Sequence, residues 1–157
     1  MREAIFLKYE LHQYWYTQLY LTSIDGSPLM RPMWYEYPSE MEFMNITSQF
    51  MIGPSLLYVP KLHSSNKKDS DLYDPTRINV KNYEVNVTLP VDDLWYNYFS
   101  KEVEQQDTSI FKKELALKEM LLYIRGGTIL PIKLHNNRLS LARAFFMPIK
   151  LEVYPDT

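Results

Sequence analysis

The chain has no cysteine among its 157 residues, which excludes disulfide bonds and thiolate metal sites. It also has no apolar run near the ~20 residues that cross a bilayer, so we predict no membrane span. The apolar stretch Ala4–Leu7 is too short for a signal peptide. Acidic and basic residues number 19 and 17 and are mixed along the chain, so we expect no nucleic-acid partner.

Histidine is also scarce, with three residues in the whole chain. His12, His63 and His135 lie too far apart for the ligand spacing of a metal site, and no HExxH, phosphate loop or nucleophile elbow is present. For His12, which falls on a predicted helix, a packed or hydrogen-bonded role is favoured. We therefore expect neither a metal nor a cofactor.

Aromatic residues, in contrast, are abundant at 15%, with 13 tyrosines and 3 tryptophans. They suit a β-rich core or a carbohydrate-binding surface, and packing in a core is favoured. Hydrophobic residues make up 46% and charged residues 23%, values typical of a globular protein.

The first part of the chain has a helical pattern. Residues 2–22 place apolar side chains at steps of three and four, and Asp25-Gly26 predicts the helix end. The expected buried face consists of Ile5, Tyr9, His12, Tyr16 and Leu19. Three further residues widen the apolar surface, so we expect burial on more than one side: Leu7, Leu11 and Trp15.

The next segments read as a strand at 29–37, a short helix from an N-cap at Ser39 to Met51, and a strand at 56–59. Residues 63–77 are polar and predict an exposed, mobile loop. After the loop the pattern has period two, and the short strands have the spacing of an all-β sandwich. They are expected at 78–80, 83–89, 95–98, 115–117, 121–124, 128–130 and 149–153, with a glycine turn at 125–128.

Several polar residues are candidates for chemistry. Arg31, inside an apolar strand, should pair with a carboxylate on a strand that the chain does not supply. Glu36 on the same strand is either an acid with a raised pKa or, as we favour, a rim residue paired with a base. Asp92-Asp93 reads as a turn. Asn45-Ile-Thr47 and Asn86-Val-Thr88 fit the N-glycosylation pattern.

Five motifs in order resemble the closing part of glycoside hydrolase family 31. They are Lys8–Thr17, Gly26–Trp34 with its Met-Arg-Pro-Met-Trp, Asn45–Lys61, Leu89-Pro90 with Trp95–Asn97, and Arg125-Gly-Gly-Thr-Ile-Leu-Pro131. There are departures. Where the family has Asn-Ile-Asp-Asp-Gln, this chain has Asn45-Ile-Thr-Ser-Gln49, and the aspartate of the family's Trp-Tyr-Asp is Asn97.

The resemblance implies an α+β fold. Residues 1–53 would hold the last helix and strand of a (β/α)8 barrel, and 54–157 an antiparallel β-sandwich. It implies a retaining α-glucosidase whose two catalytic aspartates lie upstream, so no catalytic residue maps onto this chain. The motif positions that we expect to be structural are Arg31, Pro32, Trp34, Gln49, Gly53, Trp95, Arg125, Gly126 and Gly127.

The resemblance also implies partners. The first is the upstream barrel of the same polypeptide, through which a carbohydrate substrate would be bound. The tail, with Arg138–Ser140 and Met147–Leu151, is most similar to the N-glycan-trimming members of the endoplasmic reticulum, which implies a regulatory β subunit. Two other hypotheses stay open. One is a glycan-binding module using Trp95, Tyr96 and Tyr98, and the other is a structural or assembly module without catalysis.

Overall fold

A computed structural model describes the chain except residues 1, 62–81, 105–109, 117–118, 135–145 and 157. The predicted loop at 63–77, the strand at 78–80, His63, His135 and Arg138–Ser140 lie outside the described residues. The helices are α1 (Arg2–Glu10), α2 (His12–Asp25), α3 (Met33–Glu36) and the 3-10 helix η1 (Met41–Asn45). The strands are β1 (Met30–Arg31), β2 (Phe50–Ile52), β3 (Leu56–Val59), β4 (Asn82–Thr88), β5 (Trp95–Asn97), β6 (Ile110–Ala116), β7 (Leu121–Arg125), β8 (Thr128–Lys133) and β9 (Ile149–Tyr154).

The predicted first helix is confirmed, as α1 and α2 with a break at Leu11. It runs to Asp25, and Gly26 closes it in the left-handed conformation at φ 74°. The predicted buried face is wrong, however. Leu11 and Tyr14 are buried, whereas Tyr16 and Leu19 are exposed. The helix carries apolar side chains of its own on all sides, so the spacing of its residues alone did not show which side packs against the core.

Two element predictions between residues 29 and 51 are also wrong. Only β1 (Met30–Arg31) of the strand forms, because Pro32 has no N–H for the ladder and its φ of −64° leads into α3. The helix expected from Ser39 is the single turn η1, which has Glu40 at its N-cap and no side-chain cap. The chain then becomes extended at Ile46 and continues into β2.

The central sheet is antiparallel, with the strand order β1-β2-β3-β7-β5, and two ribbons, β4-β6 and β8-β9, complete the β structure. This mixture of helices and antiparallel strands confirms the α+β fold class. The predicted strands at 56–59, 83–89, 95–98, 121–124, 128–130 and 149–153 form, with β8 longer than expected. The strand predicted at 115–117 is part of β6, which begins earlier, at Ile110, and residue 117 lies outside the described residues. The sheet crosses the proposed division at residue 53, since β1 and β2 precede it, and that division stays a prediction.

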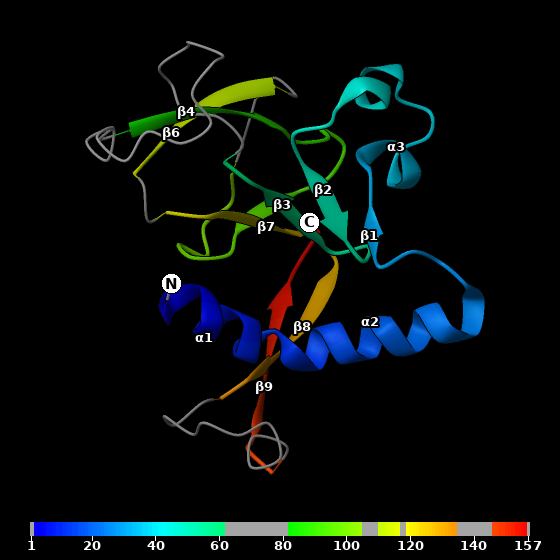
Figure 1. Cartoon of the computed structure of the whole chain (residues 1–157), viewed down its shortest axis with the longest axis vertical. Helices are drawn as coiled ribbons and strands as arrows, with labels where there is room; N and C mark the ends of the chain where they lie inside the picture. Colours follow the sequence, from blue (N-terminus) through cyan, green and yellow to red (C-terminus); the bar gives the residue numbers. More distant parts are fainter. Residues whose placement is uncertain (1, 62–81, 105–109, 117–118, 135–145, 157) are drawn as a thin grey trace, which may run out of the picture.

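Two apolar clusters cover the opposite faces of this sheet, as the alternation along β3 requires. Leu57 and Val59 belong to a cluster that Val87 of β4 and Leu115 of β6 complete. Leu56 faces the other cluster, which receives side chains from α2, β8 and β9, among them Tyr14, Leu130 and Tyr154. Figure 1 shows the same order, with β4-β6 at the top, the sheet in the middle and the helices α1 and α2 below it.

Candidate functional site

The side of α2 that points away from the sheet carries a continuous apolar surface, here called the outer helical face. Its residues are Tyr16, Leu19, Tyr20 and Ile24, with exposed fractions of 66%, 52%, 61% and 66%. Leu19, Tyr20 and Ile24 follow Tyr16 by three, four and eight residues, a spacing that places all four side chains along one stripe of the helix. Large contiguous apolar patches on a folded protein mark contact surfaces. The outer helical face is therefore the strongest candidate functional surface among the described residues.

The opposite side of α2 is fixed firmly to the sheet. The Tyr14 hydroxyl donates a 2.7 Å hydrogen bond to the backbone oxygen of Ile52. Burial of this ring raises the pKa of Tyr14 to about 12. Because one side is held in place, the outer helical face is presented by a rigid element.

Gly53 makes this close contact possible. Its φ is 60°, and a Cβ at this position would lie 2.5 Å from the Tyr14 hydroxyl oxygen and 2.8 Å from the Gln18 Oε1. No side chain fits between the β2-β3 turn and α2. The predicted motif glycine thus permits the approach of helix and sheet.

Gln49 joins the central sheet to the β4-β6 ribbon. Its buried amide donates to the Thr88 carbonyl oxygen at 2.5 Å and accepts from the Thr88 N–H at 2.9 Å. Both backbone groups of Thr88, at the end of β4, thereby find partners in a side chain of the central sheet. The glutamine side chain replaces one rung of a β-ladder between residues 39 positions apart.

We expect Gln49→Ala to lower the free energy of unfolding by about 2–4 kcal/mol, because two buried backbone groups lose their partners. Urea unfolding of this variant beside Ser48→Ala is the measurement, since Ser48 is a half-buried neighbour with no role in this link. Equal stability of the two variants would show that water replaces the amide at no cost.

Arg31 pairs within its own segment, and the prediction of a partner on an absent strand is wrong. Its guanidinium forms an ion pair with Glu36 and donates to the Pro28 carbonyl oxygen at 2.7 Å and to the Ser27 hydroxyl at 3.3 Å. The helical turn α3 after Pro32 brings Glu36 back toward Arg31, which an extended strand would not do. The favoured interpretation of Glu36, a carboxylate paired with a base, is confirmed.

Pro32 and Trp34 belong to the same turn. Pro32 is the N-cap of α3, and Trp34 in α3 is 45% exposed. Neighbouring Tyr35 is 40% exposed and lies under the Arg31 guanidinium, 5.3 Å from ring centroid to Cζ. The turn therefore displays aromatic side chains on a segment that Arg31 holds together.

Arg125 and the two glycines connect β7 to β8. The Arg125 guanidinium donates a 3.0 Å hydrogen bond to the Asp93 carboxylate, which also accepts a 2.6 Å hydrogen bond from the Tyr37 hydroxyl. Burial, together with this carboxylate, raises the pKa of Tyr37. Gly127 has φ 74°, and a Cβ on Gly126 would lie 2.9 Å from the Pro155 backbone oxygen. The predicted glycine turn is confirmed, and Asp93 lies in a bend, as expected.

The aromatic residues proposed to stack on glycans are committed to the core instead. Trp95 is 1% exposed and donates to the Pro90 carbonyl oxygen at 3.1 Å. Tyr98 is 5% exposed, and Tyr96 packs on Tyr154 with 5.2 Å between ring centroids. Trp95 and Tyr98 are buried and Tyr96 is half-buried against Tyr154, so packing and not glycan binding accounts for these three residues.

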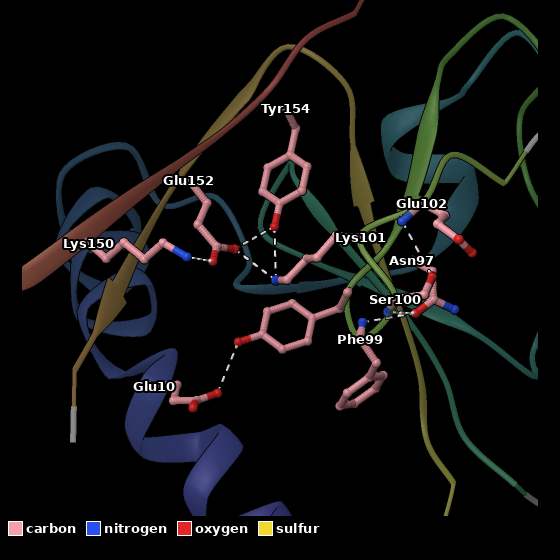
Figure 2. Close-up of polar contacts among 10 residues, drawn as sticks. Glu10, Asn97, Phe99, Ser100, Lys101, Glu102, Lys150, Glu152 and Tyr154 are labelled. Carbon is pink, nitrogen blue, oxygen red and sulfur yellow. Dashed lines mark hydrogen bonds and ion pairs between the residues drawn. The ribbon is translucent and has the colours of Figure 1, made fainter. Parts of the chain in front are cut away.

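A polar cluster that the sequence did not predict joins α1, the turn after β5, and β9 (Figure 2). Lys101 has a positive φ of 63°. Its ammonium donates hydrogen bonds to the Glu152 carboxylate at 2.8 Å and to the Tyr154 hydroxyl at 3.0 Å. The same ammonium lies 4.1 Å from the centroid of the Tyr98 ring. Tyr98 in turn donates to Glu10 of α1 at 3.2 Å. Lys101 and Glu152 are 51 residues apart, and no short-range pattern signals their pairing.

The cluster predicts a specific pH dependence. Burial alone would raise the pKa of Glu152, but hydrogen bonds from Lys101, Lys150 and Tyr154 hold it at about 2, below its ordinary 4.5. A depressed carboxyl pKa adds stability above the unfolded pKa, and this stability disappears as the pH falls from about 4.5 to 2. We expect Glu152→Gln to cost about 2 kcal/mol at pH 7 and almost nothing near pH 2.

Unfolding measured across this pH range tests the prediction. Glu84→Gln is the matched control, because the Glu84–Lys112 pair is exposed, with side-chain accessibilities of 50% and 69%, and should change stability little. A cost for Glu152→Gln that persists undiminished at pH 2 would contradict the assignment.

In the described part of the chain, no helix is long and apolar enough to cross a membrane. Within the same residues, no group of three or more His, Asp or Glu side chains is placed to hold a metal ion. His12 lies half-buried at the start of α2.

Residues 26–130 match the model of the glycosyl hydrolase family 31 C-terminal domain, so the chain belongs to glycoside hydrolase family 31. Among curated relatives, it is 30% identical to neutral alpha-glucosidase AB of Mus musculus over 83% of this chain. It is 33% identical to a probable glucan 1,3-alpha-glucosidase of Oryza sativa subsp. japonica over 85% of this chain. The chain spans only 12% and 13% of the length of those relatives.

Solved structures agree. The glucosidase II alpha subunit superimposes with a TM-score of 0.77 and 26% identity, over 98% of this chain and 15% of that one. A family 31 dextranase of Flavobacterium johnsoniae, at 21% identity, shares the fold with a TM-score of 0.80 over 99% of this chain and 17% of that one. The chain thus corresponds to a small part of these proteins.

Proposed function

We propose that this chain is the non-catalytic closing part of a family 31 α-glucosidase and supports the catalytic barrel of the same polypeptide. In this proposal the parent hydrolyses terminal α-linked glucose with carboxylates that lie upstream. The observation that carries the proposal is the outer helical face, a rigid apolar stripe for which the described residues provide no cover. A barrel element packed on Tyr16, Tyr20 and Ile24 would bury it.

Among the described residues, the candidate carboxylates Glu36 and Asp93 are engaged in structural contacts and not in glycoside hydrolysis. Such hydrolysis needs two carboxyl groups on either side of the scissile bond, about 5–9.5 Å apart depending on the mechanism. Glu36 is bound to Arg31, and Asp93 is bound to Tyr37 and Arg125. Both serve the structure, which supports placing catalysis outside this chain.

The finer assignment concerns compartment and partner. Relatives include neutral alpha-glucosidases, and one matching structure is an ER glucosidase II heterodimeric complex of a catalytic subunit and the binding domain of a regulatory subunit. On this basis we propose that the parent works in the lumen of the endoplasmic reticulum on N-linked glycans. A regulatory β subunit would be its partner there. The division into a barrel end at 1–53 and a sandwich at 54–157 is part of the same proposal.

The test compares two samples for hydrolysis of an aryl α-glucoside. The pure 157-residue chain is expected to show no turnover, whereas the native protein, immunoprecipitated with an antibody against this chain, is expected to be active. Turnover by the pure chain would overturn the proposal. An inactive native protein would instead favour the assembly hypothesis, in which the chain keeps the family fold without the family's catalysis.

A further inference from the structure

The segment that leads from η1 into β2 exposes two residues, one on either side of Ile46. Asn45 and Thr47 are exposed, Ile46 between them packs against the first apolar cluster, and Gln49 is buried. The backbone at Ile46 is extended, at φ −78° and ψ 112°. Asn45 ends η1 and Thr47 follows the extended Ile46, and both side chains are exposed to solvent.

Asn45 and Thr47 form an acceptor sequence for N-linked glycans. The chain reads Asn45-Ile-Thr47 here, which fits the pattern Asn-X-Thr with isoleucine at the middle position. Gln49, two residues further on, is buried and binds Thr88.

We infer that Asn45 is an N-glycosylation site, with an oligosaccharide carried on the exposed end of η1. The surface there has room for it. Met41 and Met44 of the same short helix are 76% and 54% exposed. A glycan on Asn45 would shield these two apolar side chains from solvent. The inference rests on the proposed function, because it requires a parent polypeptide that enters the secretory pathway.

The position is compatible with docking of the chain on a barrel. In Figure 1, η1 lies in the cyan segment above α3, whereas α2 lies on the lower side of the central sheet. A glycan at Asn45 and a protein contact at the outer helical face therefore occupy separate regions. The glycan would mark the η1 end as a face that stays in contact with solvent in the parent.

The second acceptor sequence provides a comparison within the same chain. Asn86 is exposed but lies in the middle of β4, paired with Lys112 on β6. Its threonine, Thr88, is 6% exposed, and both backbone groups of that residue are bound by Gln49. At this site the acceptor threonine is part of the core, whereas Thr47 is free of the core.

The experiment uses the native polypeptide, immunoprecipitated with an antibody against this chain from source cells. Peptide N-glycosidase treatment in heavy-oxygen water converts a glycosylated asparagine to a labelled aspartate, which mass spectrometry locates. We expect the label at Asn45. In the same cells, Asn45→Gln and Thr47→Ala should each lose one glycan step in gel mobility, whereas Thr47→Ser should keep it. Asn86→Gln is the control and should leave the Asn45 label unchanged.

Protease protection in sealed microsomes shows whether a negative result concerns the glycosylation of Asn45 alone or also the proposed compartment. An unlabelled Asn45 in a polypeptide that is protected, and therefore lumenal, overturns this inference and leaves the proposed function intact. An unlabelled Asn45 in a polypeptide that protease digests overturns both the inference and the proposed compartment. A mobility step that survives Asn45→Gln and Thr47→Ala would also overturn the inference.

Discussion

The isolated chain is expected to self-associate, and replacing Tyr16, Tyr20 and Ile24 by lysine is expected to make it monomeric. These three side chains are each more than 60% exposed and lie on one stripe of α2. At ~25 cal/mol per Å² of buried apolar area, covering a patch of a few hundred Å² contributes about 5–10 kcal/mol. Without its natural cover, this face will meet another copy of itself.

Size-exclusion chromatography with light scattering measures the effect. The matched control places lysine at Thr17 and Ser23, exposed polar positions on the same helix, and adds charge without removing apolar area. We expect the control to associate as the unchanged chain does. A monodisperse monomer of the unchanged chain, with a cooperative melt, would mean that the outer helical face needs no partner.

The same three substitutions have the opposite consequence in the parent polypeptide. There, lysine at these positions would place charge in a packed interface, where an unpaired charge is costly. We therefore expect a lower yield of folded, active parent protein. If the outer helical face is an interface within the parent, the substitutions should reduce self-association of the isolated chain and also reduce the yield of folded parent protein.

Gly53→Ala is expected to destabilise the fold by about 3–5 kcal/mol. The residue has φ 60°, where an L side chain costs about 1–2 kcal/mol. The new Cβ would also lie 2.5 Å from the Tyr14 hydroxyl oxygen, which must move and lose its bond to Ile52. Overpacking and a lost buried hydrogen bond each add about 1–3 kcal/mol, and partial relaxation limits the sum.

Gly26→Ala separates the two causes. Gly26 has φ 74°, but a Cβ there meets nothing within 4 Å. It should cost only the conformational term of about 1 kcal/mol. Urea unfolding of both variants, in the lysine-substituted chain if that chain is monomeric, gives the comparison. Equal losses of unfolding free energy in Gly53→Ala and Gly26→Ala would show that a Cβ at residue 53 fits between α2 and the β2-β3 turn.

The sequence predicted the β strands after residue 82 well because each is short, alternates in polarity and ends in turn residues. The prediction from sequence was wrong where a single residue changed the backbone conformation of a segment that is otherwise apolar. Between residues 29 and 37 the composition favours a strand, but Pro32 withdraws a backbone donor and starts a helical turn. This turn also explains Arg31, which reaches Glu36 through local geometry that an extended strand does not have.

The candidate surface could be predicted only in part. The sequence showed that the first helix has apolar residues on all sides, and hence that two surfaces would need burial. Which stripe faces the sheet depends on the fit of Tyr14 and Gln18 around Gly53, a contact between distant segments. The cluster of Lys101 with Glu152 and the link from Gln49 to Thr88 are likewise long-range, and the residues involved carry no local signal.

The size of the native polypeptide tests the central claim most directly. An immunoblot of source cells with an antibody against this chain gives it in one step. A band several times heavier than 18.8 kDa is the expected result, since the chain covers only 12% of a curated relative such as the mouse enzyme. A single band near 18.8 kDa would contradict the claim, because a chain of that size has no barrel to cover the outer helical face.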